Sequence, residues 1–132
     1  MTKKRETQRQ ECIKNNNTIR IGSKHKGKHV YVKDIIYIQA SENYTFIHLQ
    51  NGGRILSSKC LKYYESLLTS IGFIRIHRSF LVHLIHIKEY EGKYRLLHLS
   101  DQNILSVSYR KKTSISKIIN NQVFPQATQE VA

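Results

Sequence analysis

The segment from residue 73 to residue 87, FIRIHRSFLVHLIHI, most constrains the fold of this chain. Its apolar residues are mainly β-branched or aromatic, which is typical of strands. A short basic stretch containing Arg75, His77, Arg78 and Ser79 interrupts this run. Because a buried strand gains nothing from such side chains, we interpret the insert as an exposed functional loop between β-prone segments.

Short β-prone segments separated by turn residues fill most of the remaining chain and predict a mainly β, antiparallel fold. The pair Asn51-Gly52 suits a two-residue hairpin turn. Alternation in residues 94–99 leaves open which face of that strand is buried. We expect strands over residues 19–22, 30–32, 35–40, 44–49, 54–57, 85–90, 94–99 and 104–107.

Two segments have the spacing of helices. In residues 59–71, apolar side chains recur every three or four residues, with Ser58 as the expected N-cap and Gly72 just beyond the end. A second, C-terminal helix is expected after Ser108, with isoleucines on one side. We expect one domain over residues 18–121, a disordered basic tail over residues 1–17 and a flexible tail over residues 122–132.

The charge of the chain favours anionic partners. Lys and Arg total 22 against 9 Asp and Glu, which gives a formal net charge of +13. Such a field attracts phosphates and, less commonly, an anionic membrane surface. No apolar stretch approaches the roughly 20 residues that span a bilayer, and we expect a cytoplasmic protein. Cys12 and Cys60 form no CxxC pair, so we expect free thiols.

Three segments, in order along the chain, resemble motifs of the LytTR family, the DNA-binding domain of bacterial transcription regulators. Residues 73–83 resemble F-x-R-x-H-R-S-[FY]-L-V-N, with His83 in place of the Asn. Residues 34–45, DIIYIQASENYT, are similar to D-I-x-Y-I-E-A-x-x-N-Y, and residues 104–112, ILSVSYRKK, to I-P-V-S-R-R-x. The resemblance covers roughly residues 18–120. The resemblance implies a response-regulator output domain, and a complete chain of 132 residues would be too short for a receiver domain beside it.

The resemblance implies an elongated stack of antiparallel β-sheets whose loops enter successive major grooves of double-stranded DNA. Asn can pair with adenine and Arg with guanine in that groove, so the expected base contacts are Asn43, Tyr44, Arg78 and Arg110. Hydroxyls and cations suit phosphates, which position the protein without reading sequence. We expect His77 to contact phosphate or to hydrogen-bond its own loop. The expected phosphate contacts are Lys59, His77, Ser79, Ser106, Ser108, Lys111 and Lys112.

Other functions stay open at this point. A nonspecific or RNA-binding module would use the same charge, with bases stacked on exposed aromatics such as Tyr44. A membrane or protein-interaction module would need an amphipathic basic helix, which residues 109–119 fit weakly. We expect no catalysis, cofactor or metal, since His83 and His86 would point to opposite faces of a strand. Direct repeats in DNA, bound by two copies or a homodimer, are the expected target.

Overall fold

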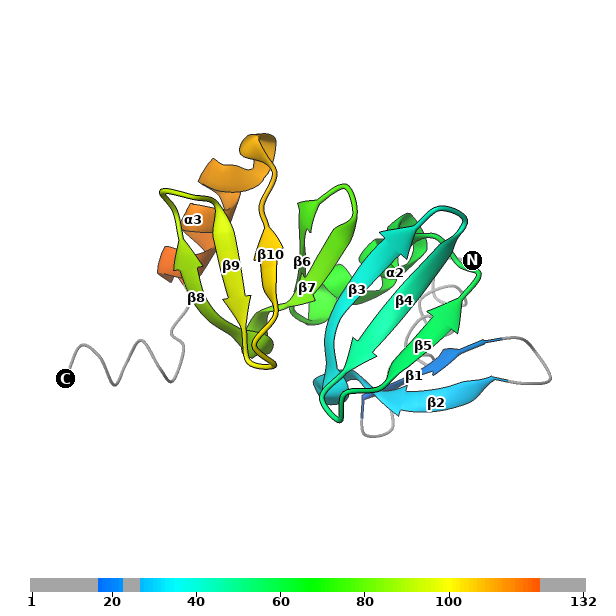
Figure 1. Cartoon of the computed structure of the whole chain (residues 1–132). Coiled ribbons are helices and arrows are strands. Elements are labelled where there is room, and N and C mark those ends of the chain that lie inside the picture. The colour runs from blue at the N-terminus through cyan, green and yellow to red at the C-terminus, as the bar shows by residue number, and fades with distance from the viewer. Residues whose placement is uncertain (1–16, 23–26, 122–132) are drawn as a thin grey trace, which may run out of the picture.

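Within residues 17–22 and 27–121, the part of the chain that the computed structural model describes, the strands form three antiparallel sheets. The five-stranded and three-stranded sheets lie side by side along the long axis of the molecule (Figure 1). The prediction of a mainly β, elongated stack is therefore confirmed.

The two-stranded sheet consists of β1 (Thr18–Ile21) and β2 (Lys28–Tyr31). The five-stranded sheet has the order β5-β4-β3-β7-β6, with β3 (Ile35–Ser41), β4 (Tyr44–Leu49), β5 (Arg54–Ser57), β6 (Phe73–His77) and β7 (Phe80–His83). The three-stranded sheet has the order β10-β9-β8, with β8 (Ile87–Glu91), β9 (Leu96–Leu99) and β10 (Ile104–Ser106).

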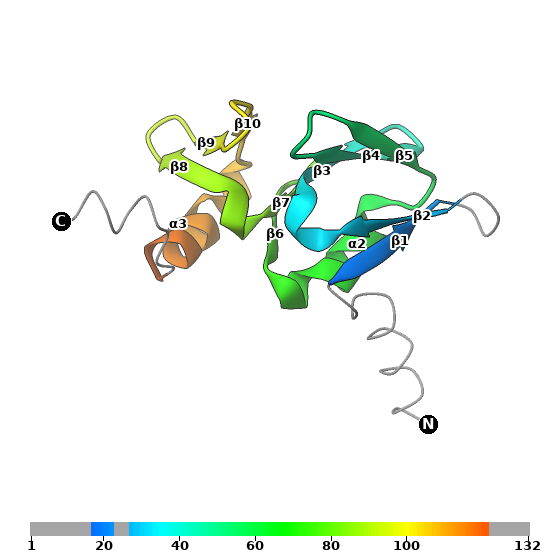
Figure 2. The same ribbon diagram turned by 90° about the horizontal axis from the view of Figure 1, so that it is seen from below.

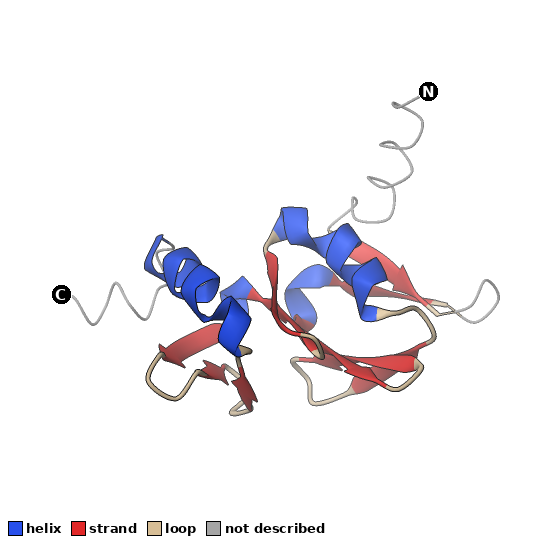
Figure 3. Ribbon diagram, turned by 90° about the horizontal axis from the view of Figure 1, so that it is seen from above, coloured by secondary structure: helices blue, strands red, loops and turns tan. Residues whose placement is uncertain are grey.

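Helices α2 (Leu61–Leu68) and α3 (Lys112–Asn121) lie on the same side of the row of sheets (Figures 2 and 3). Helix α2 covers the five-stranded sheet and α3 covers the three-stranded one. Short 3-10 turns connect several elements: η1 (Val32–Asp34), η2 (Thr69–Ile71), η3 (Leu84–His86) and η4 (Tyr109–Lys111). The helices within the described residues are too short and too polar to cross a membrane.

Strand β3 joins the two hydrophobic cores of the molecule. Its first four residues are all buried, and the register with β4 is irregular between Ile35 and Tyr37. Ile35 and Ile38 contribute to one core, whereas Ile36 and Tyr37 contribute to the other. A strand with both faces buried has a continuous apolar sequence rather than an alternating one, which explains the run Ile-Ile-Tyr-Ile.

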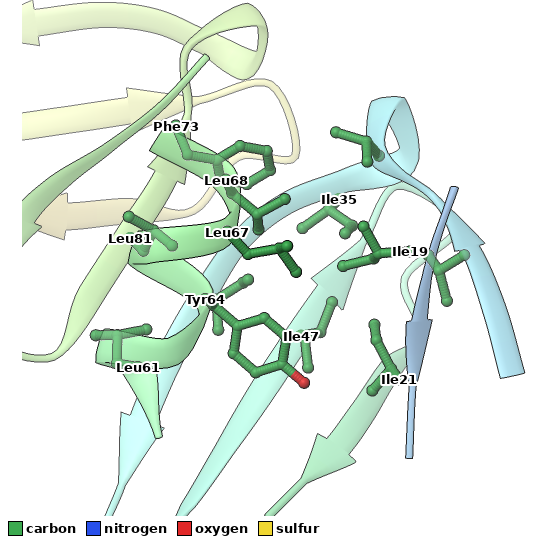
Figure 4. Packing of buried hydrophobic residues seen from close by; sticks show 13 residues of the cluster. Ile19, Ile21, Ile35, Ile47, Leu61, Tyr64, Leu67, Leu68, Phe73 and Leu81 are labelled. Atoms are coloured by element: carbon green, nitrogen blue, oxygen red, sulfur yellow. The ribbon is translucent and has the colours of Figure 1, made fainter. Parts of the chain in front are cut away.

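The first core lies between α2, β1 and the five-stranded sheet. Tyr64 and Leu68 of α2 are almost completely buried, and they face Ile19 and Ile21 of β1 and Ile47 of β4 (Figure 4). The hydroxyl groups of Ser57 and Tyr64 share a hydrogen bond of 2.6 Å in this core. Burial of this many apolar side chains fixes α2 firmly against the sheet.

The helix predicted over residues 59–71 is confirmed in type but not at its start. The α-helix itself ends at Leu68, and the 3-10 turn η2 continues to Gly72, whose φ of 105° lies in the left-handed region that glycine tolerates. Ser58 is not the N-cap, because the helix starts two residues later, at Leu61, and Cys60 takes that position without a side-chain cap. The hydroxyl of Ser57 instead accepts a hydrogen bond from the Lys59 amide at 3.1 Å.

The main corrections concern the starts of two strands and the length of one turn. The strand expected over residues 85–90 starts at Ile87, because η3 bends the chain first. The strand expected from residue 94 starts at Leu96, because the preceding turn extends to Arg95, whose φ is 54°. Leu97 and Leu99 form its buried face. The predicted two-residue turn at Asn51-Gly52 is longer, since residues 50–53 separate β4 from β5.

The predicted terminal tails, residues 1–17 and 122–132, lie outside the described residues apart from Asn17. The same holds for residues 23–26. The domain boundaries therefore stay predictions.

Candidate nucleic-acid interface

Three loops that carry the predicted site residues lie at one long edge of the molecule. Strands β3 and β7 are antiparallel neighbours, with Gln39 opposite Phe80. The Ala40 amide donates a hydrogen bond of 2.8 Å to the Ser79 carbonyl. The β3–β4 turn and the β6–β7 turn therefore project from the same end of the sheet, and the loop after β10 lies in line with them (Figure 1).

The first loop is the β3–β4 turn, formed by Glu42 and Asn43. Ser41 pairs with Tyr44 across this two-residue turn, and Glu42 has a φ of 54°. Asn43 and Tyr44 are exposed, so both side chains are accessible to a partner. The Thr45 hydroxyl donates to the Lys59 carbonyl at 3.0 Å, which holds Lys59 beside the base of this loop.

The second loop is the β6–β7 turn, formed by Arg78 and Ser79. His77 pairs with Phe80 and Arg75 pairs with Leu81, so Ile76 is left as an extra residue in a β-bulge. The Ser79 amide donates to Nδ1 of His77 at 3.1 Å. His77 thus hydrogen-bonds its own loop, and in its neutral form the ring carries its proton on Nε2. Arg78 is exposed at the tip.

The third loop follows β10 and begins η4. The Ser108 amide donates a hydrogen bond of 2.9 Å to the carbonyl of the bulged residue Ile76, which fixes this loop beside the β6–β7 turn. The Lys111 amide in turn donates to the Ser108 carbonyl at 3.0 Å. Arg110 is exposed and Lys111 is half-buried. Exposed side chains also occur at Ser106 and Lys112, on either side of the loop.

A hollow of about 550 Å³ lies between the second and third loops. Four cations and one carboxylate line it, and the excess of positive charge makes it attractive to a polyanion. Its lining residues are Glu65, Arg75, His77, Arg78, Ser108, Arg110 and Lys111. The structure therefore brings together two loops that are about 30 residues apart in sequence.

Arg75 and Glu65 are components of this region that the sequence analysis did not assign. Nη1 of Arg75 contacts Oε1 of Glu65 at 2.7 Å, while Nε and Nη2 donate to the carbonyls of His77 at 2.9 Å and Arg78 at 2.7 Å. The motif resemblance included Arg75, but strand spacing gives no sign that Glu65 on α2 is its partner.

Tyr109 is a second residue without a predicted role. Its side chain is 71% exposed, and two cations contact its ring: Cζ of Arg95 is 5.6 Å from the ring centroid and Nζ of Lys112 is 5.1 Å away. Arg95 is held in place by Val107, whose amide donates to its carbonyl at 2.8 Å. The signal in the sequence was the departure at this position, where the LytTR motif has Arg.

Two buried histidines lie at the other end of strands β3 and β7. The prediction that His83 and His86 point to opposite faces is wrong, because η3 brings their ring centroids to 5.5 Å. Burial lowers the pKa of His83 to about 4, so the ring is neutral and its Nδ1 donates to the Ile35 carbonyl at 3.1 Å. His86 contacts the Lys33 carbonyl through Nε2 at 2.7 Å. Within residues 17–22 and 27–121, no three His, Cys, Asp or Glu side chains are grouped to hold a metal ion.

Comparisons with known proteins found one matching family and a similar solved structure. The family described as the LytTr DNA-binding domain matches residues 25–120. No curated protein matches the chain. Among solved structures, the LytTr DNA-binding domain of a protein described as a methyl-accepting/DNA response regulator from Bacillus cereus is similar, with a TM-score of 0.66 and 24% identity. The match covers 77% of this chain and 95% of that one. The three loops lie within the matched residues, and their contacts with DNA stay predictions.

Proposed function

The chain belongs to the LytTr DNA-binding domain family, and on this premise we propose that it recognises a specific sequence in double-stranded DNA through the major groove. It would act in the cytoplasm as the output domain of a bacterial transcription regulator, without catalysis. The observation that carries the proposal is the placement of Arg78 and Arg110. Both are exposed on neighbouring loops that a backbone hydrogen bond joins, beside a cationic hollow.

Base reading is assigned to the exposed tips of the three loops. A guanidinium can donate two hydrogen bonds to O6 and N7 of guanine, which suits Arg78 and Arg110, and an Asn amide can pair with adenine, which suits Asn43. Tyr44, which is 49% exposed next to Asn43, offers a ring for the thymine methyl or a base edge. Because a backbone hydrogen bond, from Ser108 to Ile76, joins the second and third loops, their arginines would read bases at a fixed separation.

Phosphate contacts are assigned to the groups that flank these tips. Lys59, Lys111 and Lys112 supply charge, whereas Ser79, Ser106 and Ser108 supply short hydroxyl donors. The free Nε2 of His77 is available to donate to a phosphate, since Nδ1 accepts the Ser79 amide. These contacts would position the readers and contribute most of the salt-dependent affinity.

A second candidate is a nonspecific or RNA-binding module, and one observation favours it. Tyr44 and Tyr109 are 49% and 71% exposed, and both belong to the loops of the candidate interface. Such rings can stack bases of a single strand irrespective of sequence. The hydrogen bonds from Arg75 to the Arg78 carbonyl and from the Ser108 amide to the Ile76 carbonyl hold the two arginine loops in a defined arrangement, which favours duplex reading instead.

Selection of random DNA duplexes by the purified protein tests the proposal. We expect enrichment of a short motif in two direct repeats, separated by about one or one and a half helical turns, roughly 10 to 16 base pairs. Two copies of the chain, bound separately or as a homodimer, would occupy them. Enrichment of no motif, together with equal affinity for single strands, would support the nonspecific module.

A further inference from the structure

We propose that Arg75 and Glu65 form a positioning pair that fixes the β6–β7 turn for base reading, without either side chain contacting DNA. The inference rests on the proposed function, since it assigns part of the DNA sequence specificity to two residues that lie behind the reading surface. Arg75, for which the sequence predicted no role, would then be a structural support for Arg78.

The hydrogen bonds of Arg75 are directed inward. Nε and Nη2 donate to the carbonyls of His77 and Arg78, and Nη1 contacts the Glu65 carboxylate at 2.7 Å. The side chain of Arg75 is only 20% exposed. A planar guanidinium presents its donors in a fixed geometry, so one group orients two consecutive carbonyls of the turn, including that of Arg78 itself.

The β6–β7 turn needs such support. Two-residue hairpin turns normally have positive φ angles, which match the twist of the strands. Glu42 supplies one in the β3–β4 turn, whereas neither Arg78 nor Ser79 has a positive φ. The bulge at Ile76 also interrupts the pairing of β6 with β7 just before the turn. The hydrogen bonds that Arg75 donates, and the one that the His77 ring accepts from the Ser79 amide, thus hold a turn that its own backbone does not favour.

Glu65 connects the turn to the rigid part of the molecule. It lies on α2 beside Tyr64, which is 1% exposed in the first core. A carboxylate in a hollow that faces phosphates weakens DNA binding by repulsion. Glu65 is the one acidic residue among the described residues that line this hollow. Its contact with Arg75 gives it a role that offsets this repulsion.

The first test replaces Arg75 by Lys, which keeps the charge and loses the planar fork. We expect the ratio of affinities for selected and random duplexes to fall by about tenfold, part of what a bidentate base contact supplies. The slope of log affinity against log salt should not change, because no phosphate contact is lost. Arg54→Lys is the matched control: Arg54 lies on β5 with its guanidinium 4.5 Å from the Phe46 ring centroid, and its replacement should change neither quantity.

The second test uses Glu65→Ala, for which electrostatics and positioning predict different results. Loss of a negative charge alone would raise affinity for all duplexes equally. The positioning role predicts that affinity for random duplexes rises while the preference for the selected duplex falls. In the free protein, hydrogen exchange of the Ser79 amide should be faster in both variants, a readout that needs no DNA.

The outcomes separate the two proposals. An unchanged preference in both Arg75→Lys and Glu65→Ala would overturn the positioning pair. So would a salt slope smaller by about 0.9 in Arg75→Gln, because Arg75 would then contact a phosphate. Absence of any sequence preference in the unmodified protein would overturn the proposed function instead. Thermal unfolding shows whether Arg75→Lys or Glu65→Ala loses its fold. If one of them does, the DNA preference of the other variant decides whether the positioning pair exists.

Discussion

The two ends of the β3–β7 strand pair differ in whether their polar side chains are exposed or buried. At one end, the turns expose Asn43 and Arg78, and the Arg75–Glu65 ion pair lies behind them. At the other end, His83 and His86 are buried, and they hydrogen-bond the carbonyls of Ile35 and Lys33. The first end has the properties of a binding surface and the second those of a structural anchor. The same pair of strands thus separates recognition from stability, which can be tested end by end.

Acid should affect the anchor most strongly. An unfolded His takes up a proton near pH 6.5, whereas burial lowers the pKa of His83 in the folded protein to about 4. The unfolded state therefore binds more protons between these values, so stability is complete above about pH 6.5 and decreases as the pH falls toward 4. The loss attributable to His83 is about 3 kcal/mol. Urea unfolding between pH 4 and pH 8 measures it.

His83→Asn is the matched control for this pH dependence. The amide can still donate a hydrogen bond to the Ile35 carbonyl, and the LytTR motif has Asn at this position, but Asn does not titrate. We expect the stability of the variant to decrease less between pH 6.5 and pH 4, and its preference among DNA sequences to be unchanged. If the stability of the variant decreased as steeply with falling pH as that of the unmodified protein, groups other than His83 would cause the decrease.

At the reading end, Arg78→Ala and Arg110→Ala should each reduce discrimination between selected and random duplexes by about 1 to 3 kcal/mol. Both side chains are exposed, so the free energy of unfolding should change little. Binding titrations with both duplexes, together with urea unfolding, measure the two effects. If either variant lost stability and kept its sequence preference, the separation between the two ends would be wrong.

The phosphate contacts should give a smaller and uniform effect. Lys59→Ala and Lys112→Ala each remove one exposed cation beside the loops. We expect weaker binding to selected and random duplexes by the same factor, and a salt slope smaller by about 0.9 for each contact. Lys88→Ala, an exposed cation on β8 without a predicted role, is the control. A loss confined to the selected duplex would make either lysine a base reader.

The accuracy of sequence-based prediction also differs between local and tertiary features. The three- and four-residue spacing of apolar side chains located α2, and the preference for glycine just beyond a helix located Gly72, because both features depend on residues close together in the chain. The start of β8 was missed, since η3 forms when His86 reaches the Lys33 carbonyl, 53 positions away. For the candidate site, the motif resemblance supplied Arg78 and Arg110. Their closeness depends on the bond between Ser108 and the bulged Ile76, which has no local signal.

Tyr109 should give the smallest effect and the sharpest test between the two candidate functions. Its ring contacts Arg95 and Lys112, and such contacts at exposed sites contribute about 0.5 to 1 kcal/mol. If Tyr109 only orients these cations, Tyr109→Leu should weaken all duplexes about two- to fivefold, and Tyr109→Phe, which keeps a ring, should bind normally. A ring that stacks bases would instead contribute about 1 to 3 kcal/mol to single-strand binding. Loss of single-strand affinity by tenfold or more in Tyr109→Leu, with duplex affinity unchanged, would therefore favour the nonspecific module over the sequence-specific regulator.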